Sequence, residues 1–238
     1  ALGSLASFLY LAGLAWREMG KRDLRRGFTL AGPLSAGLPG VWRFAGATNF
    51  SSSLDVAFTH IVTLAVGAVM GPAPAALWRI GRQVADGFAK PARLLIPALY
   101  PELAKLRAAG GIDQMRNLAV RIGLVGGGAA AVLLAVTAVA GKPLLSLVMG
   151  QAFAAASDVM TWQVAAAAVG VLALPIEPML VTLGAAGAAM RVRLAVCVAY
   201  LAILIPLIEA FGLTGAGAAL LAAMILMTAG MFFKLRQT

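Results

Sequence analysis

The sequence predicts an all-α fold, a polytopic bundle of transmembrane helices. Its 238 residues are 61% hydrophobic and only 12% charged, whereas soluble domains are about 45–50% apolar and about 25% charged. Apolar runs of about 20 residues, the length that crosses a bilayer, recur between breaks rich in glycine, proline or basic residues. This composition argues strongly against a water-soluble enzyme or a nucleic-acid-binding domain, even though the formal net charge is +10.

The first apolar run, residues 1–16, is shorter than a complete membrane span. At 1.5 Å per residue it covers about 24 Å of a hydrocarbon core about 30 Å thick. No basic region precedes it, which argues against a cleavable signal peptide. We expect it to be the end of a longer helix, and the chain to be the C-terminal part of a larger membrane protein. Residues 1–40 then form this helix end and a basic cytoplasmic linker, and residues 41–238 form a lobe of six transmembrane helices.

Glycine and proline mark the ends of the helices in the lobe. A helix at residues 41–70 is followed by a tight turn at Gly71 and Pro72, and the next helix extends to about residue 110. Because proline removes a backbone donor and crowds the preceding turn, we expect interruptions at Pro91, Pro97 and Pro101. The remaining predicted elements are helices at 113–140 (with Asp113 as N-cap), 154–184, 191–210 and 213–233, a short interfacial loop at 141–153, and close-packing glycine surfaces at 126–128 and 215–217.

Basic residues gather at one set of helix ends. The other set of ends holds Lys142 alone on this reading. By the positive-inside rule, the basic ends and the C-terminus are cytoplasmic and the turn at Gly71 faces outside. The cytoplasmic set comprises Arg17, Lys21, Arg22, Arg25, Arg26, Arg43, Lys105, Arg107, Arg116, Arg121, Arg191, Arg193, Lys234 and Arg236.

Four further basic residues fit neither set of ends, because they lie inside the helix that follows Gly71. Together with the uncharged Gln83 and the acidic Asp86, these four basic residues recur at steps of three and four. This spacing places all six on one helical face. An ionisable group at membrane depth costs about 2.5–3.5 kcal/mol and usually faces a bundle interior or an aqueous cavity. We predict a cation-lined, anion-binding cavity; the alternative is a set of interhelical pairs that hold the bundle together. The six residues are Arg79, Arg82, Gln83, Asp86, Lys90 and Arg93. Arg82 with Asp86, and Asp86 with Lys90, are i,i+4 pairs of opposite sign, so we expect part of this charge to be neutralised locally.

Three carboxylates are candidates for ion coupling. Asp55 shares a polar face with several Thr and Ser residues and lies at a depth similar to that of Asp86, so the two could face each other across a helical hairpin. Glu177 lies between two prolines, where a kink could form an ion site or a hinge. The alternative is a plain kink with Glu177 at the cytoplasmic interface. His60 is expected to be a packed or hydrogen-bonded histidine rather than a proton carrier.

The sequence carries no motif for enzymatic chemistry. Cys197 is the single cysteine, and no Cys/His cluster has metal-ligand spacing. Phosphate-binding nucleotide loops, nucleophile elbows and zinc helices are also missing. We therefore expect neither a cofactor, nor a metal, nor catalysis.

Four stretches of the sequence carry a family resemblance. Residues 71–83, GPAPAALWRIGRQ, and residues 97–106, PALYPELAKL, resemble the turn and long helix of bacterial oligosaccharide flippases. These belong to the MATE-like multidrug/oligosaccharidyl-lipid/polysaccharide exporter superfamily. Residues 144–153, LLSLVMGQAF, and the LVTLG run at 180–184 with the arginines that follow it, are similar to two further loops of that superfamily.

The resemblance implies two six-helix lobes around a central cavity, with this chain holding the last helix of the first lobe and all of the second. It also implies a substrate, an undecaprenyl-pyrophosphate-linked oligosaccharide for lipopolysaccharide, capsule or exopolysaccharide, moved across the inner membrane by alternating access. The expected partners are this lipid-linked oligosaccharide, membrane lipids, and a polysaccharide polymerase and glycosyltransferases. Nucleic acid is not expected.

Two other functions stay open at the level of sequence. A multidrug or cation antiporter of the same superfamily would need net carboxylate in its site, whereas the helix after Gly71 is net basic. A polytopic envelope-glycan polymerase or scaffold would be expected to carry a large outside loop, and the outside loops predicted here are short.

Overall fold

The computed structural model describes residues 10, 13–14, 17, 20–21 and 41–237. The chain divides into two compact units, Ala1–Arg43 and Phe44–Thr238. In the first unit, the described positions between 10 and 21 are helical, and the predicted linker at 22–40 lies outside the described residues. The side chains at 41–45, 47–48, 51–52, 54–55, 57–59, 144, 148–149 and 152–153 are also outside the description.

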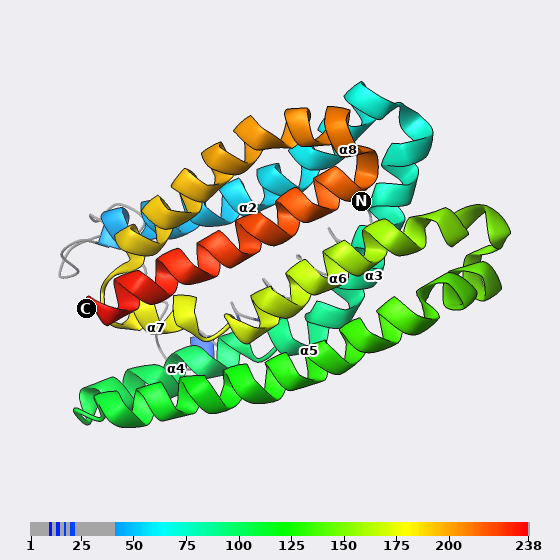
Figure 1. The fold of residues 1–238 in the computed structure, drawn as a ribbon. Helices are drawn as coiled ribbons and strands as arrows, with labels where there is room; N and C mark the ends of the chain where they lie inside the picture. The colour runs from blue at the N-terminus through cyan, green and yellow to red at the C-terminus, as the bar shows by residue number, and fades with distance from the viewer. Residues whose placement is uncertain (1–9, 11–12, 15–16, 18–19, 22–40, 238) are drawn as a thin grey trace. The chain divides into compact units, whose positions relative to one another are not determined.

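From residue 41 onward every described element is helical, which confirms the predicted all-α fold. In Figure 1 the connections α4–α5 and α7–α8 lie at the same end of the bundle as the C-terminus. The connections α2–α3 and α5–α6 and a bend within α8 lie at the opposite end. The elements are α2 (Val41–Met70), α3 (Pro72–Arg93), α4 (Ile96–Ala108), α5 (Ile112–Met149), the 3₁₀ helix η2 (Gln151–Ala156), α6 (Ser157–Leu172), α7 (Ile176–Thr182) and α8 (Ala186–Arg236).

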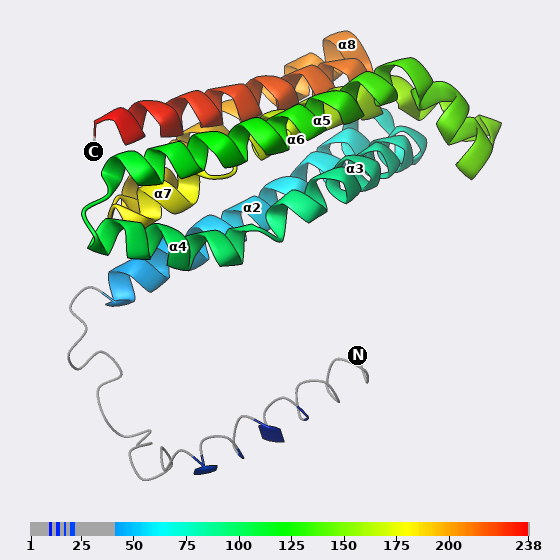
Figure 2. The same ribbon diagram turned by 90° about the horizontal axis from the view of Figure 1, so that it is seen from below.

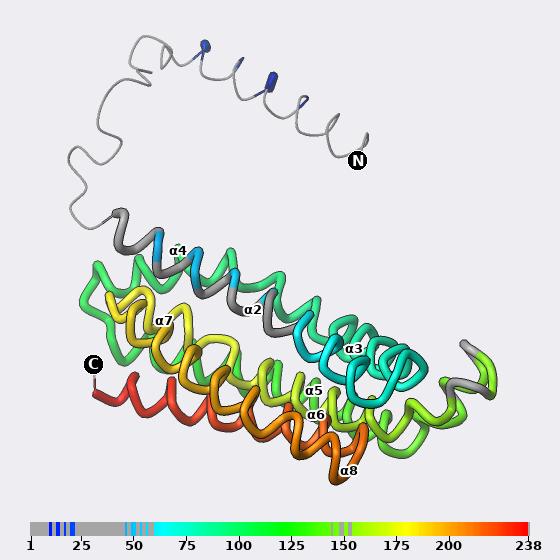
Figure 3. Tube along the Cα trace, turned by 90° about the horizontal axis from the view of Figure 1, so that it is seen from above, coloured from blue at the N-terminus to red at the C-terminus, as the bar shows by residue number. Residues whose placement is uncertain are grey.

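Three apolar stretches of the described chain are long enough to cross a membrane: Ile112–Pro143, Ala154–Thr182 and Ala186–Arg236. The last of them is two helices, because Gly212 has φ 60° and ψ −140°, a conformation open essentially to glycine alone. The two halves of α8 run back along each other, as Figures 2 and 3 show. The predicted pair of helices on either side of residue 212 is therefore confirmed.

Of the three expected interruptions one is found, a break at Leu94 and Leu95 just before Pro97, and those at Pro91 and Pro101 are wrong. Pro97 lies in the first turn of α4, where its missing N–H has no helical partner to lose. Pro91 and Pro101 lie inside α3 and α4. The chain therefore changes direction at one break, where the sequence predicted three interruptions.

The predicted loop at 141–153 is also wrong. The helix α5 continues through Pro143 to Met149, and Gly150, with φ 96°, then leads into η2. At the other end of α5, Gly111 rather than Asp113 is the N-cap, and no side chain caps the helix. Asp113 lies in the first turn, where a carboxylate still favours the positive end of the helix dipole.

Small residues bring the helices close together, as the glycine runs predict. Gly217 lies against Trp162, and a Cβ added there would come within 2.6 Å of the Trp162 Cβ. Gly126 and Gly127 of α5 approach the C-terminal end of α6 in the same way. Gly128 faces open space, so the prediction fails at that position.

The core joins α3 to α6 and α8. Trp78, 2% exposed, packs in one cluster with Met160 of α6 and Leu204 of α8. Gly81 allows the close approach of α3 and α6, because a Cβ there would come within 3.2 Å of the Met160 Cα. This packing fixes which face of α3 turns inward and which faces stay available for a site.

Candidate functional site

The helix α3 has three distinct faces. Its buried face, which includes Trp78, Gly81 and Ala85, packs against α6. An apolar flank that includes Phe88 and Pro91 borders a groove shared with α5. The third face carries the α3 stripe, the six polar positions predicted from the sequence, and the structure places all of them in this one helix: Arg79, Arg82, Gln83, Asp86, Lys90 and Arg93.

Asp86 lies at the centre of the α3 stripe and joins two arginines. Its Oδ2 accepts a hydrogen bond from Arg82 Nε at 3.2 Å, and its Oδ1 lies 3.7 Å from Arg93 Nη2. The pair of Arg82 with Asp86 was predicted, but the predicted pair of Asp86 with Lys90 is wrong, because the longer Arg93 side chain reaches the second carboxylate oxygen from two turns away. Four cations against one carboxylate leave the stripe net positive.

Arg82 is the more enclosed of the two arginines that pair with Asp86: 22% of its side chain is exposed, against 51% for Arg93. It lies close enough to Tyr200 of α8 for the two groups to interact electrostatically. Tyr200 is 1% exposed and lies in an apolar run, so nothing in the sequence pattern marked it. The stripe therefore begins in the helix interface and extends outward to exposed Arg79, Lys90 and Arg93.

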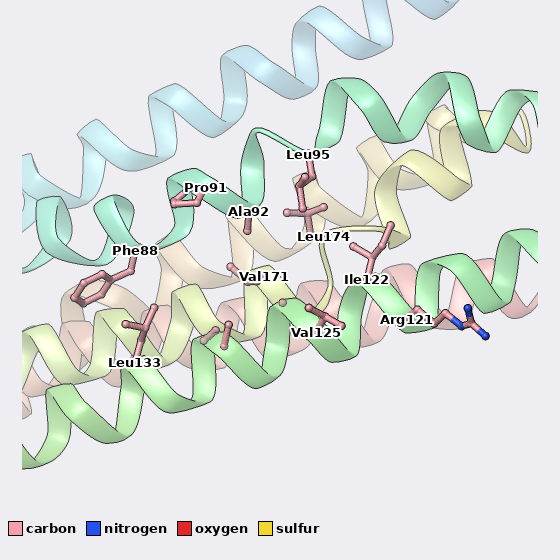
Figure 4. A pocket seen from close by; sticks show the side chains of 13 residues that line it. Phe88, Pro91, Ala92, Leu95, Arg121, Ile122, Val125, Leu133, Val171 and Leu174 are labelled. Carbon is pink, nitrogen blue, oxygen red and sulfur yellow. The ribbon is translucent and has the colours of Figure 1, made fainter.

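The groove beside α3 is not the cationic cavity that the sequence predicts. Its volume is about 520 Å³, and apolar side chains of α3, α5 and α6 line it. None of the four cations of the α3 stripe is among the lining residues. Figure 4 shows Phe88 and Leu133 toward one end and Arg121 at the other, with its guanidinium directed away from the apolar side chains. The stripe is thus an open face of α3 rather than the wall of this groove.

The predicted contributions of α2 are only partly within the described structure. The side chain of Asp55, a predicted candidate for ion coupling, lies outside the described residues. His60 is exposed, so packing, the first of its two predicted states, is wrong, and the hydrogen-bonded state stays a prediction. The reason is its register: Val62 and Val66 turn the buried side of α2 into the core, and His60 lies on a different side of the helix.

A second polar cluster joins α7, α8 and α4. Arg193 Nη2 donates a hydrogen bond of 2.6 Å to Glu177 Oε2, and 13% of the Arg193 side chain is exposed. The Tyr100 side chain lies near enough to interact electrostatically with both. The sequence assigned Arg193 to topogenic loop charge, but the structure places it in α8 as the partner of Glu177.

Replacing Glu177 with glutamine is expected to destabilise the protein by about 1.5–3 kcal/mol, because a hydrogen bond to a largely buried guanidinium would lose its charged acceptor. Thermal unfolding of the purified protein in detergent measures this effect. Glu209→Gln is the matched control, since Glu209 is an exposed carboxylate on α8. Equal unfolding temperatures for the two variants would contradict a stabilising ion pair.

Among the buried polar residues that sequence reasoning missed, Gln163 joins two helices. It is 1% exposed, and its Nε2 donates a hydrogen bond of 3.1 Å to the Trp78 carbonyl oxygen. This bond joins α6 to the buried face of α3. Its side chain also lies directly over Gly81. A lone amide in the apolar run of α6 was the available signal, since buried polar groups in membrane helices usually have an interhelical partner.

The long apolar helices define a membrane-embedded helical bundle. The chain is similar to the inner membrane protein YghQ of Escherichia coli (strain K12), with 34% identity over 147 residues. The matched stretch is 61% of this chain and 41% of that protein, so it covers less than half of the relative's length. No protein-family model and no solved structure matches the chain.

Proposed function

We propose that this chain forms one lobe of a flippase that moves an undecaprenyl-pyrophosphate-linked oligosaccharide across the bacterial inner membrane by alternating access. The observation that carries the proposal is the α3 stripe, a net positive face on a helix of a membrane-embedded bundle. A pyrophosphate is a dense anion, and arginine presents donors that match phosphate oxygens. A second lobe, as the sequence resemblance implies, would close this open face into a cavity.

Asp86 has a positioning role in this proposal. Each arginine has five N–H donors, and the contacts with Asp86 occupy only the Nε of Arg82 and one terminal nitrogen of Arg93. The remaining donors stay available for phosphate oxygens. Holding two flexible side chains in place before the substrate arrives lowers the entropy cost of binding.

Ion coupling would act on carboxylates that already have arginine partners. A proton or sodium ion that binds Asp86 would compete with Arg82 and Arg93, and one that binds Glu177 would compete with Arg193. Such competition links ion binding to the position of an arginine, which is the kind of differential contact that alternating access requires. Asp55 is the third candidate for this role.

The orientation in this proposal follows the basic residues, with several membrane crossings and a cytoplasmic C-terminus. Many of these residues lie at the α4–α5 and α7–α8 end of the bundle, together with the C-terminus (Figure 1). Clustered positive charge at one end is typical of the cytoplasmic side.

The test is flipping of a fluorescent lipid-linked oligosaccharide by the intact protein in proteoliposomes, with and without proton or sodium gradients. We expect translocation of the pyrophosphate-linked lipid and no efflux of a quaternary ammonium dye. Efflux of the dye without movement of the lipid would favour the cation antiporter instead. A rate that responds to neither gradient would remove the coupling role of all three carboxylates.

A further inference from the structure

A second groove lies away from the α3 stripe, between α5, the α6–α7 break and the C-terminal half of α8. Its volume is about 740 Å³, within the range of about 300–1,000 Å³ that ligand pockets occupy. Gly123 and Pro175 help to shape it. Gly123 is buried and allows α5 to approach the end of α6, where a Cβ would come within 2.9 Å of the Leu172 carbonyl oxygen.

Two arginines and an otherwise apolar lining give this groove an amphipathic character. Arg116 comes from the first turns of α5 and Arg236 from the last turn of α8, and the lining contains no acidic residue. The Arg236 guanidinium lies 4.6 Å from the centroid of the Phe232 ring, a contact that holds it at the groove. Neither arginine forms an ion pair with any residue that the structure describes.

The apolar part of the lining is exposed on the outer surface of the lobe. Val120 and Leu124 of α5 are 49% and 65% exposed, and Leu172 at the end of α6 is 47% exposed. In a membrane-embedded bundle such side chains meet lipid tails. The groove of Figure 4 is apolar as well, but its one arginine points away, so it offers no comparable site for a charged headgroup.

We infer that this groove, the Arg116–Arg236 groove, binds an anionic phospholipid, with the phosphate between the two guanidinium groups and an acyl chain along the apolar lining. Charge complementarity selects this occupant, because basic pockets between transmembrane helices on the cytoplasmic side bind anionic headgroups. Both arginines come from the end of the bundle that holds the C-terminus and the α4–α5 connection (Figure 1). The inference requires that the bundle is embedded in a membrane with this end at the cytoplasmic face, as proposed above, and it is independent of the transported substrate.

Native mass spectrometry of the delipidated intact protein tests the site. The probes are phosphatidylglycerol and phosphatidylethanolamine with identical acyl chains, and inorganic phosphate as the headgroup anion alone. We expect phosphatidylglycerol to bind at least about tenfold more tightly than phosphatidylethanolamine. Equal binding of the two lipids, or displacement of phosphatidylglycerol by an equal concentration of phosphate, would overturn the inference.

Variants separate this site from general surface charge. Arg116→Gln with Arg236→Gln is expected to abolish the preference for phosphatidylglycerol, and Arg116→Lys with Arg236→Lys to keep most of it. The matched control is Arg107→Gln with Arg191→Gln, which removes two exposed cations outside this groove and is expected to bind as the wild type does. Equal loss of the preference in the control pair and the glutamine pair would refute a defined site, and the unfolding temperature of each variant shows whether it is folded.

Discussion

Replacing Arg82 with glutamine in the intact protein is expected to lower the rate of oligosaccharide flipping by tenfold or more. Arg82 is the most enclosed of the ion-paired cations on the α3 stripe, and Asp86 fixes its guanidinium through a 3.2 Å hydrogen bond. Hydrogen bonds to charged groups contribute about 1.5–3 kcal/mol, which corresponds to roughly 10–150-fold in rate if they form in the rate-limiting state. The measurement is flipping in proteoliposomes, with surface polysaccharide in cells as the second readout.

Comparison with Asp86→Asn separates substrate binding from a purely structural role of this ion pair. If Arg82 matters only as the partner of Asp86, adding Arg82→Gln to Asp86→Asn should cause no further loss of activity, since the pair is already broken. If Arg82 contacts the pyrophosphate, the double variant flips the lipid at least about tenfold more slowly than Asp86→Asn alone. Arg121→Gln is the control, because it removes an exposed cation that points away from the apolar groove beside α3 (Figure 4). Full activity of Arg82→Gln, at normal expression, would remove the α3 stripe from the mechanism.

Local patterns in the sequence predicted much of the helix layout. The helix at Val41–Met70 and the turn at Gly71 follow from an apolar run that ends at a glycine and a proline, and both are found as expected. The predictions of helix breaks that failed concern proline. Pro143 lies inside α5, and Pro91, Pro97 and Pro101 together accompany a single break. Whether a proline ends a membrane helix depends on how neighbouring groups satisfy the freed carbonyls, and a single sequence does not contain that information.

In the candidate site, the sequence predicted the arrangement within one helix but not the contacts between helices. The α3 stripe was predictable because helical periodicity alone aligns its six positions. The pair of Glu177 with Arg193 and the hydrogen bond of Gln163 with Trp78 join different helices across 16 and 85 residues of sequence. Such contacts follow from helix packing, which single-sequence patterns do not specify. Sequence reasoning could identify the charged side chains, but not which distant partner each one has.

Replacing Gly215 with alanine is expected to destabilise the protein by about 1–3 kcal/mol, at the upper end of that range. The reversal at Gly212 brings the two halves of α8 so close that a Cβ at Gly215 would overlap the backbone carbonyl of Leu207. A clash with a flexible side chain can be relieved by a change of rotamer, but a clash with a backbone carbonyl requires the two helices to separate. Separation would also disturb Ala216 and Ala219, which are 0% and 1% exposed in the core.

Unfolding of the purified protein in detergent, followed by circular dichroism, measures this effect, and Gly187→Ala provides the comparison. Gly187 lies in the same element, and a Cβ there meets nothing within 4 Å. In that variant the alanine adds helix propensity without a clash, so its stability should equal or slightly exceed that of the wild type. Equal stability of the two variants would mean that the two halves of α8 are not held at this distance. It would contradict the tight hairpin at Gly212. A selective loss in Gly215→Ala would instead establish the helix reversal on which the pairing of α8 with α6 depends.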